Sequence, residues 1–446
     1  MTPNSPQPLS WTGIVRLGLV QFALGAVVVL TTSTLNRVMV VELALPATLP
    51  GFLVGIHYAM QVFRPRLGHG SDLGGRRAPW IIGGMAVLAA GGVLAASATV
   101  LMATELLAGV ALAIAAFVMI GIGVGAAGTS LLVLLAKRTS PERRSAAASI
   151  TWIMTIAGFI VTTAAAGRAL DPFSGPRLVA VSSVVSMIAM ILTLAGVWNI
   201  ESKTPAPGMR HARTRDASFG EGFREVWREP STRRFAIFIF ISMLAYSAQD
   251  LILEPFAGMV FGMTPGETTQ LSGVQHTGAL TGMLLVPAIN MLMPAWRMRT
   301  TAWIIAGCLA SALALTGLAL AALVGPPWPL RLSVLMLGVT NGVYAIAAIG
   351  AMMKLVDSGH RNREGMRMGM WGAAQAISFG IGGFIGTLAS DAARRALPSL
   401  SLSYSLVFAA EAGLFVLAAC LAARIGRPST GKHPAGPMPS PANQGA

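Results

Sequence analysis

The chain has 446 residues, of which 54% are hydrophobic and 11% are charged, and its mean hydropathy is +0.67. Soluble domains carry roughly 25% charged residues, so this balance excludes an ordinary soluble protein. The formal net charge of +15 would suit a nucleic-acid-binding protein, but no zinc-finger spacing or RNA-binding signature accompanies it. The basic residues lie in loops beside apolar segments, where anionic lipid headgroups attract them, so we expect membrane lipid and no nucleic acid as a partner.

Apolar stretches of about 20 residues, the length that crosses a bilayer core, recur along the chain and predict an all-α polytopic membrane protein. The two cysteines, Cys308 and Cys420, fall inside such stretches and predict neither a disulfide framework nor a metal site. In chain order the twelve predicted transmembrane spans are Leu17–Leu35, Ala47–Phe63, Trp80–Met102, Leu106–Leu135, Ala146–Ala166, Leu178–Ile200, Phe235–Met259, Leu271–Leu292, Thr301–Val324, Leu332–Val356, Gly369–Ala389 and Leu402–Ala423.

The distribution of lysine and arginine predicts the orientation of these spans. Cytoplasmic loops are enriched in Lys and Arg, and the enrichment sets the topology of a multi-pass protein. With the N-terminus inside, the cytoplasmic segments hold all the basic residues except Arg37, Arg168, Arg177, Arg331, Arg394 and Arg395. We therefore expect both termini to face the cytoplasm.

The loop between the second and third spans carries a spaced motif, G-x-x-x-D-x-x-G-R-R. Its members are Gly68, Asp72, Gly75, Arg76 and Arg77. This spacing at this place resembles the cytoplasmic loop of major facilitator transporters, where such a charge cluster latches two six-helix halves in one state. A solvated basic loop held down by lipid is the simpler alternative, and the full spacing favours the latch.

One long polar stretch divides the chain into two halves of six spans each. We expect an N-terminal half at residues 1–200, a cytoplasmic linker at 201–234, a C-terminal half at 235–424 and a disordered tail at 425–446. The apolar spacing within Phe219–Trp227 predicts a short amphipathic helix in the linker. A weak repeat, in which Ile156–Thr162 recurs as Ile381–Thr387, supports two pseudo-symmetric halves with a site at their interface.

Polar side chains inside the spans are the candidate binding residues, because such groups are expensive in a bilayer and usually face the bundle interior. Asp250 and Glu254 are four residues apart and share a helical face, which Pro255 follows. The alternative is an ion-pair network at the non-cytoplasmic rim, and the two interpretations stay open. Glu411, in span 12, has no evident partner in the sequence. The full set, just after span 1 and within span 7, is Asn36, Arg37, Glu42, Gln249, Asp250 and Glu254.

Two histidines lie within spans that the repeat makes equivalent, His57 in span 2 and His276 in span 8, the latter beside Gln275. They could face each other across the central axis. Imidazole is a good axial ligand for a chlorin magnesium and can also carry protons. A plain helix-to-helix hydrogen bond is the common role of a membrane histidine, so the sequence leaves these alternatives open.

Three stretches of the chain resemble one family in detail. They are Asn36–Leu43, His57–Asp72 and Gln249–Gly258, the last reading QDLILEPFAG, and Gln275-His276 followed by Gly278 and Gly282-Met283 also fits. The pattern is similar to that of the PucC–LhaA family of purple photosynthetic bacteria. The resemblance covers essentially all twelve spans.

The resemblance implies a major-facilitator-like protein that assembles light-harvesting antenna complexes, delivering bacteriochlorophyll as bound cargo or chaperoning antenna polypeptides in the photosynthetic membrane. Pigment-biosynthesis enzymes and the reaction-centre core complex are further implied partners. In that context His57 and His276 become candidate axial ligands of the pigment magnesium. A protein that binds only the polypeptides is the alternative within the family.

The sequence favours a protein that is not an enzyme. A prenyl-transferring synthase needs clustered aspartates to hold Mg²⁺ and diphosphate. The six aspartates here never come close together in sequence, so we expect no catalytic site. The competing hypothesis is a proton-coupled transporter of a small amphipathic solute, with Asp250 or Glu254 as the proton carrier.

Overall fold

The structure, a computed structural model, describes residues 9–63, 76–140, 143–201, 224, 227–293, 299–358 and 364–425. These residues form helices joined by short turns, and no strand occurs among them. In chain order the helices are α1 (Trp11–Val29), η1 (Leu30–Thr34), α2 (Leu35–Arg37), η2 (Val38–Glu42), α3 (Thr48–Met60), η3 (Gln61–Phe63), α5 (Ala78–Leu101), α6 (Leu106–Arg138), α7 (Arg144–Ala169), α8 (Gly175–Val197), α10 (Pro230–Phe261), α11 (Pro265–Leu292), α12 (Thr300–Val324), α13 (Leu330–Ser358), α14 (Glu364–Ala396) and α15 (Leu400–Ile425).

The twelve predicted spans correspond to twelve helical segments within the described residues, so the all-α polytopic class is confirmed. Ten of them are long and apolar enough to cross a membrane by length and composition. The other two are α3, a helix of 13 residues, and α11, which carries several polar residues along its 28. α3 is therefore apolar but too short to meet the length, whereas the polar residues of α11 lower its hydropathy.

The first span is longer than predicted and contains two wide turns. Helical structure runs from Trp11 to Glu42, and both Leu30–Thr34 and Val38–Glu42 are π-helical. A π turn inserts one extra residue, rotates the following side chains and is frequent at functional sites. The two π turns flank Asn36 and Arg37, so they set where these polar side chains point.

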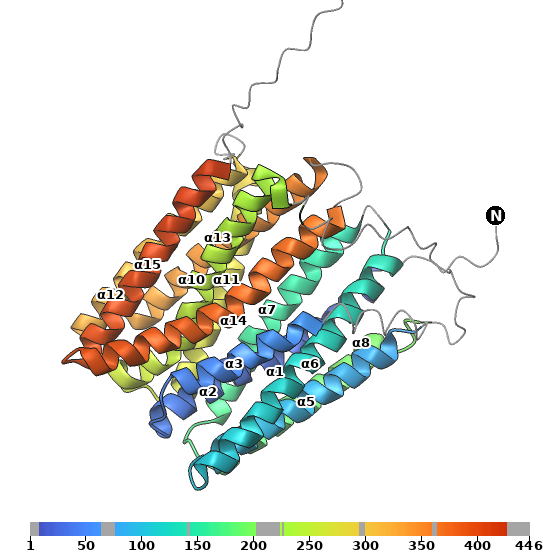
Figure 1. The fold of residues 1–446 in the computed structure, drawn as a ribbon. Coiled ribbons are helices and arrows are strands. Elements are labelled where there is room, and N and C mark those ends of the chain that lie inside the picture. The colour runs from blue at the N-terminus through green and yellow to red at the C-terminus, as the bar shows by residue number, and fades with distance from the viewer. Residues whose placement is uncertain are drawn as a thin grey trace, which may run out of the picture.

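The helices form two lobes, each with its own hydrophobic core. The first lobe is α1–α8 and the second is α10–α15, and the buried apolar residues divide into two clusters along the same lines, except that Leu251 of α10 packs with the first. Figure 1 shows the blue-to-green helices of the first lobe grouped beside the yellow-green-to-red helices of the second. Two six-helix halves are therefore present, as the sequence predicted.

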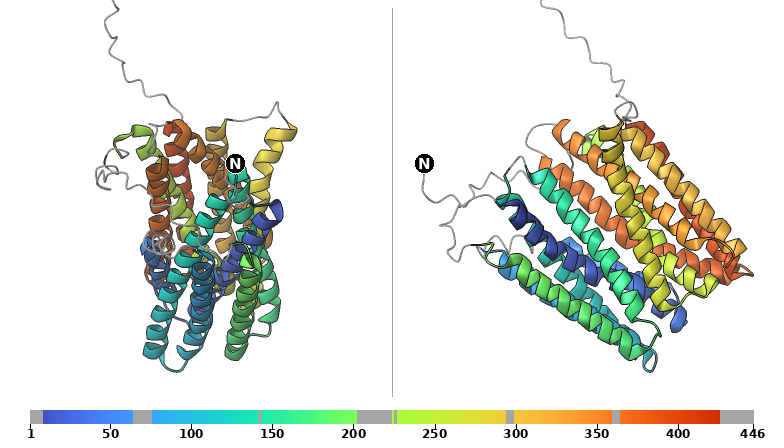
Figure 2. Two further views of the ribbon diagram at one scale, coloured as in Figure 1. Left: turned by 90° about the vertical axis from the view of Figure 1, so that its right-hand side faces the viewer. Right: turned by 180° about the vertical axis from the view of Figure 1, so that it is seen from behind.

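The lobes meet mainly along two pairs of helices, α3 with α14 and α7 with α11. The view from behind in Figure 2 shows α7 and α11 side by side at the lobe boundary. We call these two pairs the seams. We call the side on which α1 begins and α15 ends the terminal side, and the opposite side the far side.

Within the second lobe, α11 and α13 lie in unusually close contact through glycines. Gly278 and Gly282 on α11 face the α13 backbone, and Gly338 and Gly342 on α13 face the α11 backbone. Each pair has G-x-x-x-G spacing, which lets membrane helices approach closely. This contact fixes the helical rotation of α11 and hence the direction of Gln275 and His276.

Several predictions fall outside the described residues. Gly68, Asp72 and Gly75 of the loop motif lie there, as do most of the predicted Phe219–Trp227 helix and the C-terminal tail. The domain boundaries drawn from the sequence stay predictions.

Candidate functional site

The structure places Pro255 inside a continuous helix. α10 continues past Pro255 to Phe261. A proline lacks the N–H that would bond the carbonyl four residues earlier, here Leu251. The side chain of Asn36 donates to that carbonyl at 2.7 Å, from the other lobe. An amide from the first lobe thus completes the helix of the second.

Glu254 is the centre of a buried polar cluster between the lobes. Ser33, on the first π turn, donates a hydrogen bond to the Glu254 carboxylate and contacts the Ser272 hydroxyl at 3.0 Å. One residue on, Thr34 and Thr269 pair at 3.0 Å. Glu254 is only 2% exposed. Side chains from η1, α10 and α11 therefore converge on one carboxylate.

Asp250 and Gln249, adjacent in sequence, point in different directions. Asp250 lies close to Gln275 of α11, one helical turn from Glu254, so these residues share the surface that faces the first lobe. Gln249 has no exposed surface and lies on the same helical face as Phe256, whose ring packs on Phe408 inside the second lobe. The structure groups Asp250, Glu254 and Gln275 and separates Gln249 from them.

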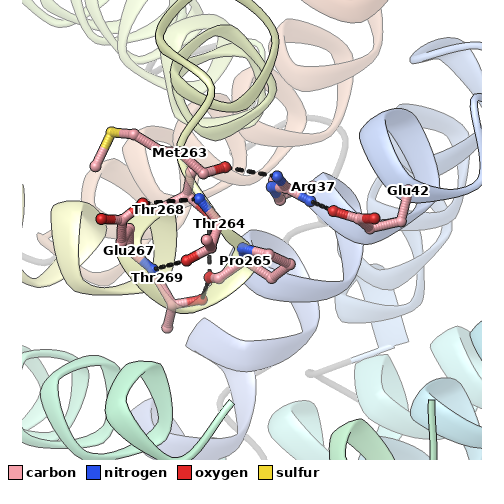
Figure 3. A network of polar contacts seen from close by, with 8 residues as sticks. All are labelled: Arg37, Glu42, Met263, Thr264, Pro265, Glu267, Thr268 and Thr269. Atoms are coloured by element: carbon pink, nitrogen blue, oxygen red, sulfur yellow. Dashed lines mark hydrogen bonds and ion pairs between the residues drawn. The ribbon is translucent and has the colours of Figure 1, made fainter. Parts of the chain in front are cut away.

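Arg37 and Glu42 form an ion pair at the far side of the same interface. Arg37 is 3% exposed, pairs with Glu42 and donates to the Met263 carbonyl at 2.7 Å. Figure 3 shows this contact beside the capping box of α11, in which Thr264 and Glu267 exchange hydrogen bonds. The rim ion pair considered in the sequence analysis is therefore present, alongside the deeper Glu254 cluster.

The two histidines have different surroundings: His57 lies beside Gly121 of α6 within the first lobe, whereas His276 lies on the α7–α11 seam. His57 is 2% exposed, and its Nε2 lies 3.0 Å from the amide nitrogen of Gln61. His276 is 6% exposed and packs against the Phe159 ring of the first lobe, with ring centroids 4.7 Å apart. Tyr58, beside His57, packs on Phe379 across the α3–α14 seam at 5.4 Å.

Asp391 closes the far end of the α3–α14 seam, and the sequence analysis missed it as a site residue. Its two carboxylate oxygens accept the backbone N–H groups of Ala47 at 3.0 Å and Thr48 at 2.8 Å. Ala47 is the N-cap of α3 and has no side chain that could accept a hydrogen bond. One indication of this contact is present in the sequence: the start of α3 has no Ser, Thr, Asp or Asn at its N-cap, so another group must accept its first hydrogen bonds.

We expect Asp391→Ala to destabilise the protein by about 1 kcal/mol, because two N–H groups at the start of α3 lose their acceptor. Thermal unfolding in detergent measures the loss. Arg395→Ala, an exposed change one turn along the same helix, should leave the unfolding temperature unaltered. Equal unfolding temperatures for Asp391→Ala and wild type would contradict the capping role.

Of the loop motif, the structure describes Arg76 and Arg77, and hydrogen bonds within the first lobe fix the backbone at Arg77. The carboxylate of Glu201, just after α8, accepts the backbone N–H of Arg77 at 2.8 Å and that of Ala78 at 2.8 Å. These are the first amides of α5, where a carboxylate is favourable. The latch role of Arg76 and Arg77 stays a prediction, because the rest of the motif lies outside the described residues.

The arrangement defines a multi-pass membrane protein with the fold of major facilitator transporters. The structure matches that of the nucleoside transporter NupG with a TM-score of 0.66 at 14% identity, covering 93% of this chain and 98% of that one. The chain belongs to the PUCC protein family, whose model matches residues 34–430. The resemblance drawn from the QDLILEPFAG stretch and its companions is confirmed.

Two curated relatives illustrate the family. The chain is 51% identical to the "Bacteriochlorophyll synthase 44.5 kDa chain" of Rhodobacter capsulatus over 93% of its own length and 95% of that protein. It is 29% identical to "Protein PucC" of Cereibacter sphaeroides over 91% and 90%.

Proposed function

We propose that this protein is a non-enzymatic assembly factor for light-harvesting antenna complexes, and that it binds bacteriochlorophyll between its lobes in the photosynthetic membrane. Antenna polypeptides are the expected recipients, with pigment-biosynthesis enzymes or the reaction-centre core complex as further partners. The terminal side is then the cytoplasmic side. The observation that carries the proposal is the buried junction of polar and aromatic side chains on the α7–α11 seam, where His276 meets Phe159.

The chemistry of this junction fits a flat, amphipathic magnesium chlorin. Such a molecule needs an imidazole for its metal, ring surfaces for its macrocycle and hydrogen-bond donors for its carbonyl groups. His276 supplies the first and Phe159 the second, whereas the Gln275 amide, next to His276 in the sequence, is directed toward Asp250. His57 fits less well as the metal ligand, because its Nε2 already lies at hydrogen-bond distance from Gln61.

Replacing His276 tests the pigment ligand directly. We expect His276→Leu, purified in mild detergent from a pigmented host, to lose most of the near-infrared absorbance that accompanies the wild-type protein. His57→Leu should retain more of that absorbance. Equal pigment in wild type and His276→Leu would remove His276 as the ligand, and a wild-type protein without pigment or antenna subunits would contradict the proposed function.

A proton-coupled transporter of a small amphipathic solute is the second candidate, favoured by Asp250 and Glu254 at the lobe interface. It requires pH-driven uptake into proteoliposomes that is lost in Asp250→Asn. The two functions differ in a simple comparison, the absorbance spectrum of cells with and without the gene. Normal antenna bands in the deletion strain would favour the transporter, and diminished bands favour the assembly factor.

A further inference from the structure

A second group of buried polar side chains lies inside the second lobe, away from both seams. It consists of Gln249 on α10, Ser311 on α12, Asn341 on α13 and Glu411 on α15. Each is 3% exposed or less. We call this group the lobe cluster.

The helical registers place the four side chains at one depth. Ser311 donates a hydrogen bond to the Asn341 side chain at 2.9 Å, which fixes α12 against α13. Tyr344, one turn beyond Asn341, packs on Phe415, one turn beyond Glu411, at 5.6 Å. All four members therefore lie about 11 to 13 residues from the far-side ends of their helices, near the middle of the bilayer.

The same four residues also share the interior of the lobe. On α10, Gln249 is two turns from Phe256, which packs on Phe408 of α15 at 5.0 Å. Glu411 lies between Phe408 and Phe415 along α15, and both rings are fully buried. Gln249 and Glu411 thus occupy the face that each helix turns toward the lobe core.

The cluster contains more hydrogen-bonding capacity than its contacts use. Within the described part of the chain, neither carboxylate oxygen of Glu411 has a hydrogen-bond partner, and neither does either amide atom of Gln249 or the amide nitrogen of Asn341. An unpaired charge at this depth is expensive, and buried charges in membrane proteins are paired or mark an ion path. The basic residues of these four helices, such as Arg331 and Lys354, are about ten or more residues away along the chain, so none is level with Glu411.

We propose that the lobe cluster binds one monovalent cation of the size of Na⁺. Its ligands are the Glu411 carboxylate, the Gln249 and Asn341 amide oxygens and the Ser311 hydroxyl, a set made wholly of oxygen atoms. The single carboxylate balances a single positive charge, whereas a divalent ion would leave an uncompensated charge in the core. Because the site joins α10, α12, α13 and α15, the ion links the helix that carries Asp250 and Glu254 to the outer helices of its lobe.

The full-length protein in detergent tests the site without reference to any cargo. Its unfolding temperature is measured while NaCl replaces choline chloride at constant ionic strength. A ligand that binds only the folded state stabilises it in proportion to occupancy. We expect a rise of several degrees that reaches a plateau with NaCl concentration.

Variants then assign the response to the cluster. Glu411→Gln should fold and show no rise with NaCl, because its neutral amide attracts no cation. Ser311→Ala should need a several-fold higher NaCl concentration for half of the rise. Glu254→Gln, which removes the carboxylate between the lobes, should keep the wild-type response.

An unfolding temperature of the wild type that is equal in NaCl and choline chloride would overturn the proposal and leave Glu411 as a neutral buried acid. A Glu411→Gln protein that still responds to NaCl as the wild type does, or loss of the response in Glu254→Gln alone, would overturn it as well. If Glu411→Gln fails to fold, the NaCl titration of the wild type still tests the proposal, together with Ser311→Ala.

Discussion

Gly282→Ala should destabilise the protein strongly. A Cβ atom at residue 282 would overlap the backbone carbonyl oxygen of Val339 on α13, and a backbone atom cannot rotate away as a side chain can. Overpacking a tight contact costs about 1–3 kcal/mol and sometimes more, and we expect the upper end here. Thermal unfolding and the yield of monodisperse protein in detergent measure the effect.

Gly317→Ala is the matched control. It makes the same chemical change in the membrane helix α12, where an added Cβ meets nothing within 4 Å. Alanine is the better helix former by about 1 kcal/mol, so this variant should be as stable as the wild type or more so. If both variants unfolded at the wild-type temperature, close glycine packing between α11 and α13 would not hold.

The second large effect concerns Asn36 and Pro255 together. Asn36→Leu removes the amide that donates to the Leu251 carbonyl, and an unsatisfied carbonyl within a bilayer is costly. Pro255→Ala restores a backbone N–H that can bond the same carbonyl within α10. We therefore expect Asn36→Leu to be destabilising alone and much less so in the presence of Pro255→Ala.

A double-mutant cycle on unfolding free energies measures this dependence. The coupling between the two positions should be about 1 kcal/mol, in the range found for hydrogen bonds in membrane proteins. Asn36→Leu paired with Pro287→Ala, a proline in the neighbouring helix α11, provides the control and should be additive. If the changes in unfolding free energy were additive in both pairs, Asn36 would not be the hydrogen-bond donor that replaces the missing N–H of Pro255.

The fold was predictable because bilayer crossing imposes a length and a polarity on each span. The largest difference in length is in the first span, where helical structure continues through two π turns to Glu42. A π turn has no hydrophobic period of its own, so the sequence pattern does not indicate it. The sequence pattern also does not indicate how such a turn rotates the side chains that follow it.

The site was predictable in part, because a polar residue in an apolar span is visible in the sequence. Asp250, Glu254, Arg37 and His276 were identified in that way, and the structure places them at the lobe interface. The hydroxyl partners Ser33 and Ser272 were not identified, because serine is common in membrane helices. Gln249 was grouped with Asp250 because the two are neighbours in the sequence. Neighbouring residues on a helix point about 100° apart, so Gln249 lies in different surroundings from Asp250.

The contact between Asp391 and the first amides of α3 bears on the autonomy of the two lobes. One lobe supplies backbone donors and the other supplies their acceptor. In a first lobe expressed alone, the backbone N–H groups at the start of α3 would have no acceptor. In a separate second lobe, the Leu251 carbonyl would lack the Asn36 amide that donates to it. Each half is thus an incomplete folding unit in lipid, and each supplies a hydrogen-bonding group that the other half lacks.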